Sequence, residues 1–213
     1  MDTAHPTIST ALLVGPVFEA GQDAREQILN PRNGGLILEV PEASTAQVDR
    51  AVAAARRAFD GWSRTTPMER STALLRIADR IEREAHDFAA LEALNCGKPI
   101  NLVLGDELPA VVDCYRFFAG AVRNQHGALA GEYLAGHTSM VRRDAVGVIA
   151  SIAPWNYPLM MMAWKLCPAI AGGNTVVFKP SEQTPLTALK MAQILAEELP
   201  EGVVSVKIGR AHV

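Results

Sequence analysis

The second half of the chain alternates between short apolar runs and amphipathic stretches, and this alternation constrains the fold more than any other feature. From Gly147 onward the pattern predicts strand, helix, strand, helix and strand over 148–152, 158–170, 175–178, 185–199 and 203–206. Each predicted strand is a continuous apolar run, which is typical of parallel strands buried on both faces. We therefore predict an α/β fold in which residues 146–206 form a βαβαβ unit, half of a doubly wound, Rossmann-like parallel sheet.

Residues 1–126 are predicted to be mainly helical and to belong to the same domain. Ser44 and Thr66 each stand three residues before a Gln or Glu, the pattern of a capping box that begins a helix. Apolar side chains at steps of three and four residues extend the second helix as one long element to Gly97. A third helix is expected after Pro109.

Residues 127–145 have a different character from both neighbours. Glycines at 127, 131 and 136 separate short extended pieces, which predicts a β-hairpin arm between the helical part and the βαβαβ unit.

The composition excludes several classes of protein. About half of the 213 residues are apolar (49%) and the formal net charge is −3, so neither nucleic acid nor an anionic membrane is an expected partner. The first residues carry no targeting signal, which favours the cytoplasm. The three cysteines lack the spacing of a zinc site, so we expect no metal and no disulfide framework.

The loops that follow the first two predicted strands are the expected location of the site, because ligands of an open parallel sheet bind outside the carboxyl ends of its strands. After the first strand, Asn156 stands just before Pro158, the first turn of the next predicted helix. The Asn156 side chain can accept a backbone N–H bond as a helix cap. Alternatively, its amide can donate to an oxyanion that forms above the sheet edge. The spacing alone favours the cap.

The loop after the second strand contains Lys179, Ser181 and Glu182. An acid at this place can accept hydrogen bonds from an adenosine ribose, and a nearby lysine can hold the same sugar or a phosphate. We count Ser181, between them, as a further candidate cofactor contact. The alternative is an ordinary solvated charged turn, and no Gly-x-Gly-x-x-Gly loop is present. The residues alone support both interpretations about equally.

Several motifs in a fixed order resemble the aldehyde dehydrogenases. They are NCGKPI at 95–100, PWNYP at 154–158 and WKLCPAIAGGNTVVFKPSEQTPLTAL at 164–189. The similarity runs from about Ile28 to Val206, and residues 116–160 look most like the 4-aminobutyraldehyde dehydrogenases, which oxidise aminoaldehydes.

The resemblance implies a role for each candidate residue. Asn156 corresponds to the oxyanion-hole asparagine of the family, and Lys179 and Glu182 to its contacts with the adenosine ribose. The wall of the cofactor cleft is matched by Ile152, Pro154 and Trp155. The implied cofactor is NAD rather than NADP, because a carboxylate at Glu182 would repel a 2′-phosphate.

The mechanism implied by the resemblance needs two groups that we do not find in this sequence. A cysteine thiolate attacks the aldehyde, a hydride passes to the nicotinamide, and a glutamate activates the water that hydrolyses the thioester. The positions of Cys96, Cys114 and Cys167 predict packing residues instead. We therefore expect an N-terminal fragment without the catalytic domain, inactive alone. The alternative is a non-catalytic, truncated nucleotide-binding module.

The resemblance also predicts partners: a small aldehyde as the substrate, and a homodimer or homotetramer for the full-length parent, because the arm resembles the family's oligomerisation hairpin. Residues 207–213 depart from the family pattern, and the codons that can spell them match the start of a widely used sequencing adapter. We expect these residues to be a non-native tail. In a fragment that stops there, the last strand would form an open edge prone to aggregation.

Overall fold

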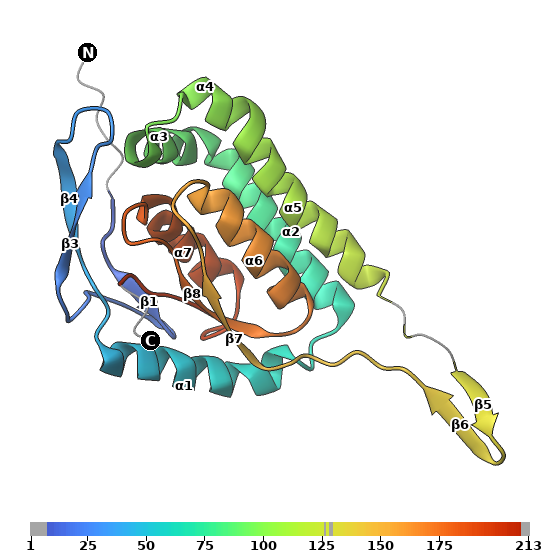
Figure 1. The fold of residues 1–213 in the computed structure, drawn as a ribbon. Coiled ribbons are helices and arrows are strands. Elements are labelled where there is room, and N and C mark those ends of the chain that lie inside the picture. Colours follow the sequence, from blue (N-terminus) through green and yellow to red (C-terminus); the bar gives the residue numbers. More distant parts are fainter. Residues whose placement is uncertain (1–7, 126, 128–129, 210–213) are drawn as a thin grey trace.

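A parallel three-stranded unit forms the centre of the chain, as the computed structural model shows for residues 8–125, 127 and 130–209 (Figure 1). Strands β7 (Val148–Ile152), β8 (Thr175–Lys179) and β9 (Val204–Val206) pair in parallel. Helices α6 (Pro158–Ala171) and α7 (Leu186–Glu198) connect them. The predicted βαβαβ unit is therefore confirmed, with every boundary within one residue of the prediction.

The sheet is covered on both faces, as the continuous apolar strands indicated. In β8, Phe178 packs in one apolar cluster with Leu166 and Ile170 of α6. Val177, which points to the opposite face, packs in a second cluster with Ala51 of α1 (Thr45–Trp62). Figure 1 shows α1 on one side of the strands and α6 on the other. Two layers of helices thus sandwich the sheet.

Helix α2 (Pro67–Arg83) and helix α5 (Leu108–Arg123) pack along each other beyond α6. The capping boxes predicted at Ser44 and Thr66 are both present, at the starts of α1 and α2. The single long helix predicted up to Gly97 is wrong, because α2 ends at Arg83 and α3 (Ala85–Cys96) begins after Glu84. The apolar spacing continues across this break, so periodicity alone could not reveal it.

The third helical segment begins earlier than predicted. Helix α4 (Ile100–Leu102) and the π-helical turn η1 (Val103–Glu107) precede α5, so helical structure extends over nine residues before Pro109. Pro109 lies in the first turn of α5, where a missing N–H does no harm.

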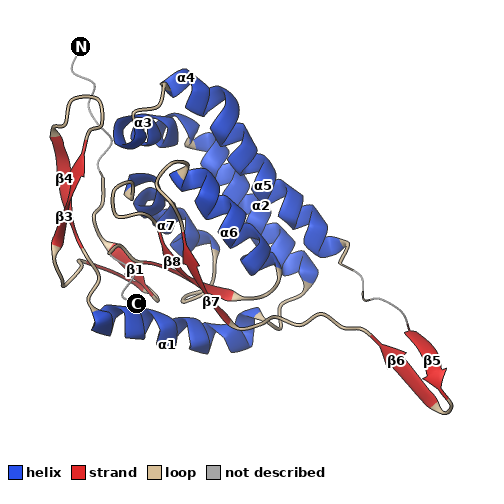
Figure 2. Ribbon diagram, viewed as in Figure 1, coloured by secondary structure: helices blue, strands red, loops and turns tan. Residues whose placement is uncertain are grey.

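The prediction that residues 1–126 are mainly helical is wrong for residues 8–41, which contain four strands (Figure 2). These strands are β1 (Leu12–Val14), β2 (Val17–Glu19), β3 (Arg25–Leu29) and β4 (Leu36–Pro41). The first two are only three residues long, too short to show a period in the sequence. Strands β3 and β4 form a separate antiparallel hairpin.

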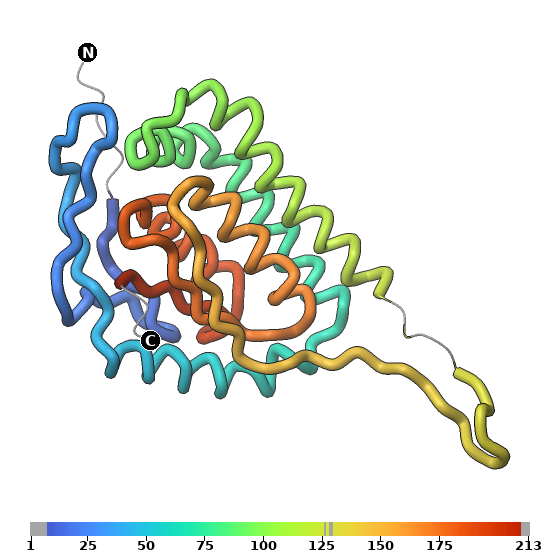
Figure 3. Tube along the Cα trace, viewed as in Figure 1, coloured from blue at the N-terminus to red at the C-terminus, as the bar shows by residue number. Residues whose placement is uncertain are grey.

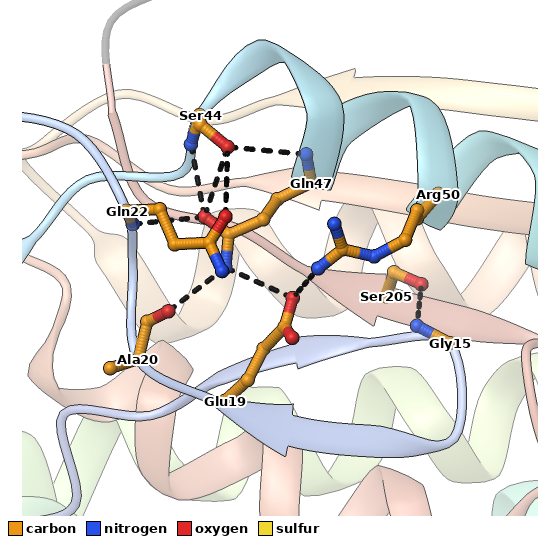
Figure 4. Close-up of polar contacts among 8 residues, drawn as sticks. All are labelled: Gly15, Glu19, Ala20, Gln22, Ser44, Gln47, Arg50 and Ser205. Atoms are coloured by element: carbon orange, nitrogen blue, oxygen red, sulfur yellow. Dashed lines mark hydrogen bonds and ion pairs between the residues drawn. The ribbon is translucent and has the colours of Figure 1, made fainter.

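Strand β1 also corrects the expected open edge. It pairs antiparallel with β9 at Leu13 and Val206, which gives the sheet order β2-β1-β9-β8-β7. The last strand is therefore internal, because the start of the chain supplies its neighbour. The backbone N–H of Gly15 also donates to the Ser205 hydroxyl at 3.0 Å (Figure 4).

A fully satisfied polar group connects β2 to α1 (Figure 4). The side-chain amide of Gln47 is buried; its nitrogen donates to Glu19 and to the Ala20 carbonyl, each at 2.9 Å. Its oxygen accepts from the backbone N–H groups of Gln22 and Ser44, each at 3.0 Å. Because every polar atom of the amide has a partner, Gln47 fixes the start of α1 against the sheet.

Strands β5 (Ala130–Leu134) and β6 (His137–Met140) form the predicted hairpin arm, which extends away from the rest of the chain (Figure 3). Large apolar side chains such as Tyr133, Leu134 and Met140 are exposed on it. The predicted non-native tail stays a prediction: Ile208 is buried and accepts a bond from Ala43 N–H at 2.8 Å, while residues 210–213 lie outside the described part.

Candidate functional site

The two candidate loops leave the sheet side by side. Ile152, the last residue of β7, is paired with Lys179, the last residue of β8. The Ala153 N–H then donates to the Lys179 carbonyl at 3.0 Å, so the pairing continues for one residue beyond the strand. The structure therefore brings together the two loops that the sequence placed apart, at the carboxyl edge where ligands of such sheets bind.

The first loop projects into solvent. Ile152, Pro154, Trp155 and Asn156 are all exposed, with Trp155 at 61%. The capping interpretation of Asn156 is wrong, because Tyr157 occupies the N-cap position of α6 and no side chain caps that helix. The Asn156 amide is thus placed at the surface of the site rather than at the helix backbone.

The second loop contains an ion pair between a buried lysine and a partly exposed glutamate. Lys179 is only 6% exposed; its ammonium donates to the Pro180 carbonyl and pairs with Glu182, both at 3.0 Å. Ser181 is buried too, and its hydroxyl accepts from the Gln183 N–H at 3.3 Å. The solvated-turn alternative does not fit a lysine that is buried, because in a solvated turn the ammonium would remain in water.

A second lysine lies at the same edge. The Lys207 N–H donates to the Phe178 carbonyl at 3.0 Å, which places Lys207 just past β9. Burial lowers the pKa of Lys207, the positive charge of Lys179 lowers it further, and Glu42 opposes both. The effect of Lys179 shows that the two ammonium groups lie near each other at this edge.

A cavity of about 370 Å³ opens beside the first loop. It lies between the β3–β4 hairpin, the end of α3 and the loops that follow β7 and β8. Of the predicted site residues, Trp155 and Asn156 line it, while Ile152, Lys179 and Glu182 do not. The remaining lining residues are Glu26, Gln27, Leu29, Pro31, Asn95, Cys96, Gln183 and Thr184.

Asn95 and Thr184 were not predicted as site residues, yet they hold the loops in place. The Asn95 amide nitrogen donates to the Gln183 carbonyl at 3.0 Å, and its oxygen accepts from the Leu186 N–H at 3.2 Å. The Thr184 hydroxyl donates to the Trp155 carbonyl at 3.3 Å. These partners are up to 91 residues apart in the chain, so no local pattern indicates them.

Cys167 and Cys114 pack in the apolar core, as predicted, whereas Cys96 is half-buried and lines the cavity. Burial and the neighbouring Glu92 raise the pKa of Cys96 to about 12, and outweigh the opposing charge of Lys98. Cys167 is fully buried, and burial raises its pKa well above the ordinary value. Only the Cys114 pKa is lowered, by a hydrogen bond with the Cys167 thiol. The raised pKa values of Cys96 and Cys167 disfavour the thiolate that a nucleophile requires.

A buried acid lies beneath the first loop. The Glu92 side chain is 2% exposed, and neither of its oxygens accepts a hydrogen bond among the described residues. Its one ion-pair contact is the Lys98 ammonium at 3.6 Å. Burial raises the pKa of Glu92 above the ordinary 4.5, although the positive charge of Lys98 opposes the shift.

The raised pKa of Glu92 predicts a pH-dependent stability. The folded chain keeps a proton that the unfolded chain releases above pH 4.5, so the free energy of unfolding falls as pH rises from 4.5 through the folded-state pKa. We expect Glu92→Gln to remove this component. The free energy of unfolding of the variant should therefore rise relative to that of the parent as pH rises. Urea unfolding at several pH values measures it, with exposed Glu201→Gln as the control. Parallel pH curves for Glu92→Gln and the parent would contradict the assignment.

The parallel unit, its helical layers and the paired loops define a doubly wound α/β protein. A sequence profile described as the aldehyde dehydrogenase family matches residues 18–213. Because this match covers most of the chain, the chain belongs to the aldehyde dehydrogenase family.

Curated relatives agree with this assignment. The chain is 43% identical over 180 residues to an aldehyde dehydrogenase of Vibrio cholerae serotype O1, and 42% identical over 180 residues to an acetaldehyde dehydrogenase of Pseudomonas aeruginosa. Each match covers 84% of this chain and 35% of the relative. The chain therefore spans about a third of the length of these relatives.

Solved structures show the same fold. Betaine aldehyde dehydrogenase of Staphylococcus aureus, in complex with NAD+, superposes with a TM-score of 0.91 at 31% identity, over 95% of this chain and 41% of that one. PnpE in complex with nicotinamide adenine dinucleotide gives a TM-score of 0.90 at 40% identity, over 94% and 41% of the two chains.

No helix in the described residues has both the length and the apolar character needed to cross a bilayer.

Proposed function

We propose that this chain is the nucleotide-binding part of an NAD-dependent aldehyde dehydrogenase that oxidises a small aldehyde to its carboxylic acid. The observation that carries the proposal is the pairing of two loops at one sheet edge, where Asn156 follows β7 and the Lys179–Glu182 pair follows β8. The substrate we propose is 4-aminobutanal or a related aminoaldehyde, from the resemblance of residues 116–160. The complete enzyme would work in the cytoplasm as a homodimer or homotetramer, joined through the arm at 127–145.

The residues at the edge fit the adenosine half of NAD. A carboxylate at Glu182 can accept bonds from the ribose hydroxyls, and the Lys179 ammonium lies 3.0 Å from it, able to reach the same sugar. Ser181 lies between them, and Ile152, Pro154 and Trp155 form an exposed wall beside the loop. When bound, NAD supplies the hydride acceptor for the oxidation.

Asn156 has a separate role in this proposal. Its exposed amide would donate to the oxygen of the aldehyde as negative charge develops there, which lowers the barrier to attack by a thiolate. The thiolate and the glutamate that activates water would be supplied by segments outside this chain. Residues 146–206 would then contribute cofactor binding and charge stabilisation, and residues 207–213 would contribute nothing native.

The test is the affinity of this chain for NAD+ and NADP+, measured by isothermal titration calorimetry. We expect Glu182→Gln to weaken NAD+ binding about tenfold or more, because hydrogen bonds to a charged group contribute about 1.5–3 kcal/mol. The preference for NAD+ over NADP+ should fall at the same time, since the repulsion of a 2′-phosphate is lost. Circular dichroism verifies that the variant, with Lys179 unpaired, is folded at the temperature of the titration.

The control is Glu201→Gln, which removes an exposed carboxylate from the turn before β9, at the opposite end of the strands. It should leave both affinities unchanged. A folded chain that binds neither dinucleotide, or binds both equally well with Glu182 intact, would count against the proposal.

A further inference from the structure

Lys98 reaches the first loop of the site from below. Helix α3 ends at Cys96, and Gly97 adopts a left-handed conformation (φ 71°) while its N–H donates to the Ala93 carbonyl at 3.0 Å. A side chain at position 97 would be strained at this φ, and its Cβ would lie 3.0 Å from Pro31. The tight turn at Gly97 is what allows Lys98 to fold back beside Glu92 on α3.

Three elements meet at the Lys98 ammonium. It lies 2.7 Å from the Glu107 carboxylate in η1, 3.6 Å from that of Glu92 in α3, and 4.1 Å from the centre of the Tyr157 ring before α6. The Lys98 side chain is 18% exposed, and those of Glu92 and Glu107 are less exposed still. Because little water competes for the ammonium, its attraction to the face of the ring is stronger than at an open surface.

The loop that carries Asn156 is thus held on both sides. On one side, the Thr184 hydroxyl donates to the Trp155 carbonyl at 3.3 Å. On the other, Lys98 holds the Tyr157 ring. Asn156 lies between these two anchors, and its own side chain is exposed at the cavity.

We propose that Lys98, oriented by Glu92 and Glu107, is a positioning residue for the loop 153–157. Its ammonium holds the Tyr157 ring and thereby sets the place of the Asn156 amide. The consequence for the reaction rests on the proposed function, in which that amide stabilises an oxyanion. The positioning itself does not, so the two can be tested separately.

The chain contains a matched control. Lys190 in α7 also lies over an aromatic ring, that of Phe88 in α3, at 5.1 Å. It pairs with Glu84 at 2.6 Å and Asp87 at 3.5 Å, and its side chain is 16% exposed, close to the 18% of Lys98. Lys190 therefore makes the same kinds of contact between α7 and α3, away from the loop.

Trp155 supplies the readout, because it is exposed and lies one residue before Asn156. Trp164→Phe removes the second exposed tryptophan, and the third, Trp62, is buried and serves as a constant background. In this form of the chain, we expect Lys98→Met to increase the population of displaced loop conformers about tenfold, as loss of a partly desolvated cation–π contact implies. Fluorescence anisotropy decay would record this as added nanosecond motion of Trp155.

Lys98→Arg should keep the anisotropy decay of Trp155 as slow as in the parent. Lys190→Met should also leave this decay unchanged, even if it lowers thermal stability as much as Lys98→Met does. If Lys98→Met fails to fold, Tyr157→Leu tests the same contact, since Tyr157 is partly exposed and the Lys98–Glu107 pair stays in place. Tyr157→Phe keeps the ring and should behave as the parent. Equal Trp155 motion in the parent and in Tyr157→Leu, or an equal effect of Lys190→Met, would overturn the positioning role. If Lys98 holds the loop 153–157 as proposed but the chain does not bind NAD, only the proposed function would be contradicted.

Discussion

Asn156→Ala is expected to lower kcat about 10²- to 10³-fold in the complete dehydrogenase proposed to contain this chain, the usual cost of losing one preorganised oxyanion donor. The physical reason is that the amide meets developing negative charge, which exists in the transition state and not in the bound aldehyde. KM should therefore change little. The structure supports this role through the exposure of Asn156 at the cavity and through Tyr157, which takes the helix-capping position instead.

Steady-state kinetics with an aminoaldehyde and NAD+ measures this effect. Asn124→Ala is the control, because Asn124 is an exposed asparagine whose side chain, among the described residues, bonds only its own helix, at the Gly120 carbonyl (3.2 Å). It should leave kcat unchanged. A loss confined to KM in Asn156→Ala would indicate a substrate contact rather than an oxyanion donor. Unchanged kinetics would remove Asn156 from the mechanism.

Phe178→Ala should destabilise the chain by about 3–5 kcal/mol, the usual cost of truncating a phenylalanine in a well-packed core. Phe178 is 0% exposed and lies in β8, which has β7 on one side and β9 on the other. Domains are usually stable by only about 5–15 kcal/mol, so this one change can remove a large part of the total. Because Phe178 directly precedes Lys179, loss of packing there would also loosen the loop after β8.

Urea unfolding followed by circular dichroism measures the change. Phe117→Ala is the matched control, because Phe117 is 62% exposed on α5 and touches Phe118 only edge to face. A surface substitution of this kind usually shifts the free energy of unfolding by about 0.5 kcal/mol or less. If Phe178→Ala and Phe117→Ala lower the free energy of unfolding equally, the helical layers do not pack on β8 as described.

The loop after β8 illustrates how far the sequence predicts the site. The position of Lys179 and Glu182 at the end of a predicted strand suggested a ribose contact, because strand ends can be read from apolar runs, but left a solvated turn equally open. The burial of Lys179 was not predictable, since it depends on Pro180 and on packing around the sheet edge. Burial is what excludes the solvated-turn alternative.

The sequence by itself determined the elements whose signals are local. The βαβαβ boundaries followed from apolar runs and helical periods, and the starts of α1 and α2 followed from Ser44 and Thr66. The hairpin arm followed from its glycines. Each of these signals lies within a few residues of the structure it specifies, because backbone hydrogen bonds in helices and turns link near neighbours.

Only the tertiary structure decided the contacts between distant segments. It placed β1 beside β9, Asn95 beside Gln183, and Lys98 under the Tyr157 ring. It also divided the predicted long helix at Glu84, whose carboxylate pairs with Lys190 of α7. The physical reason is that these contacts join surfaces that meet only after the layers have packed, so no spacing along the chain encodes them.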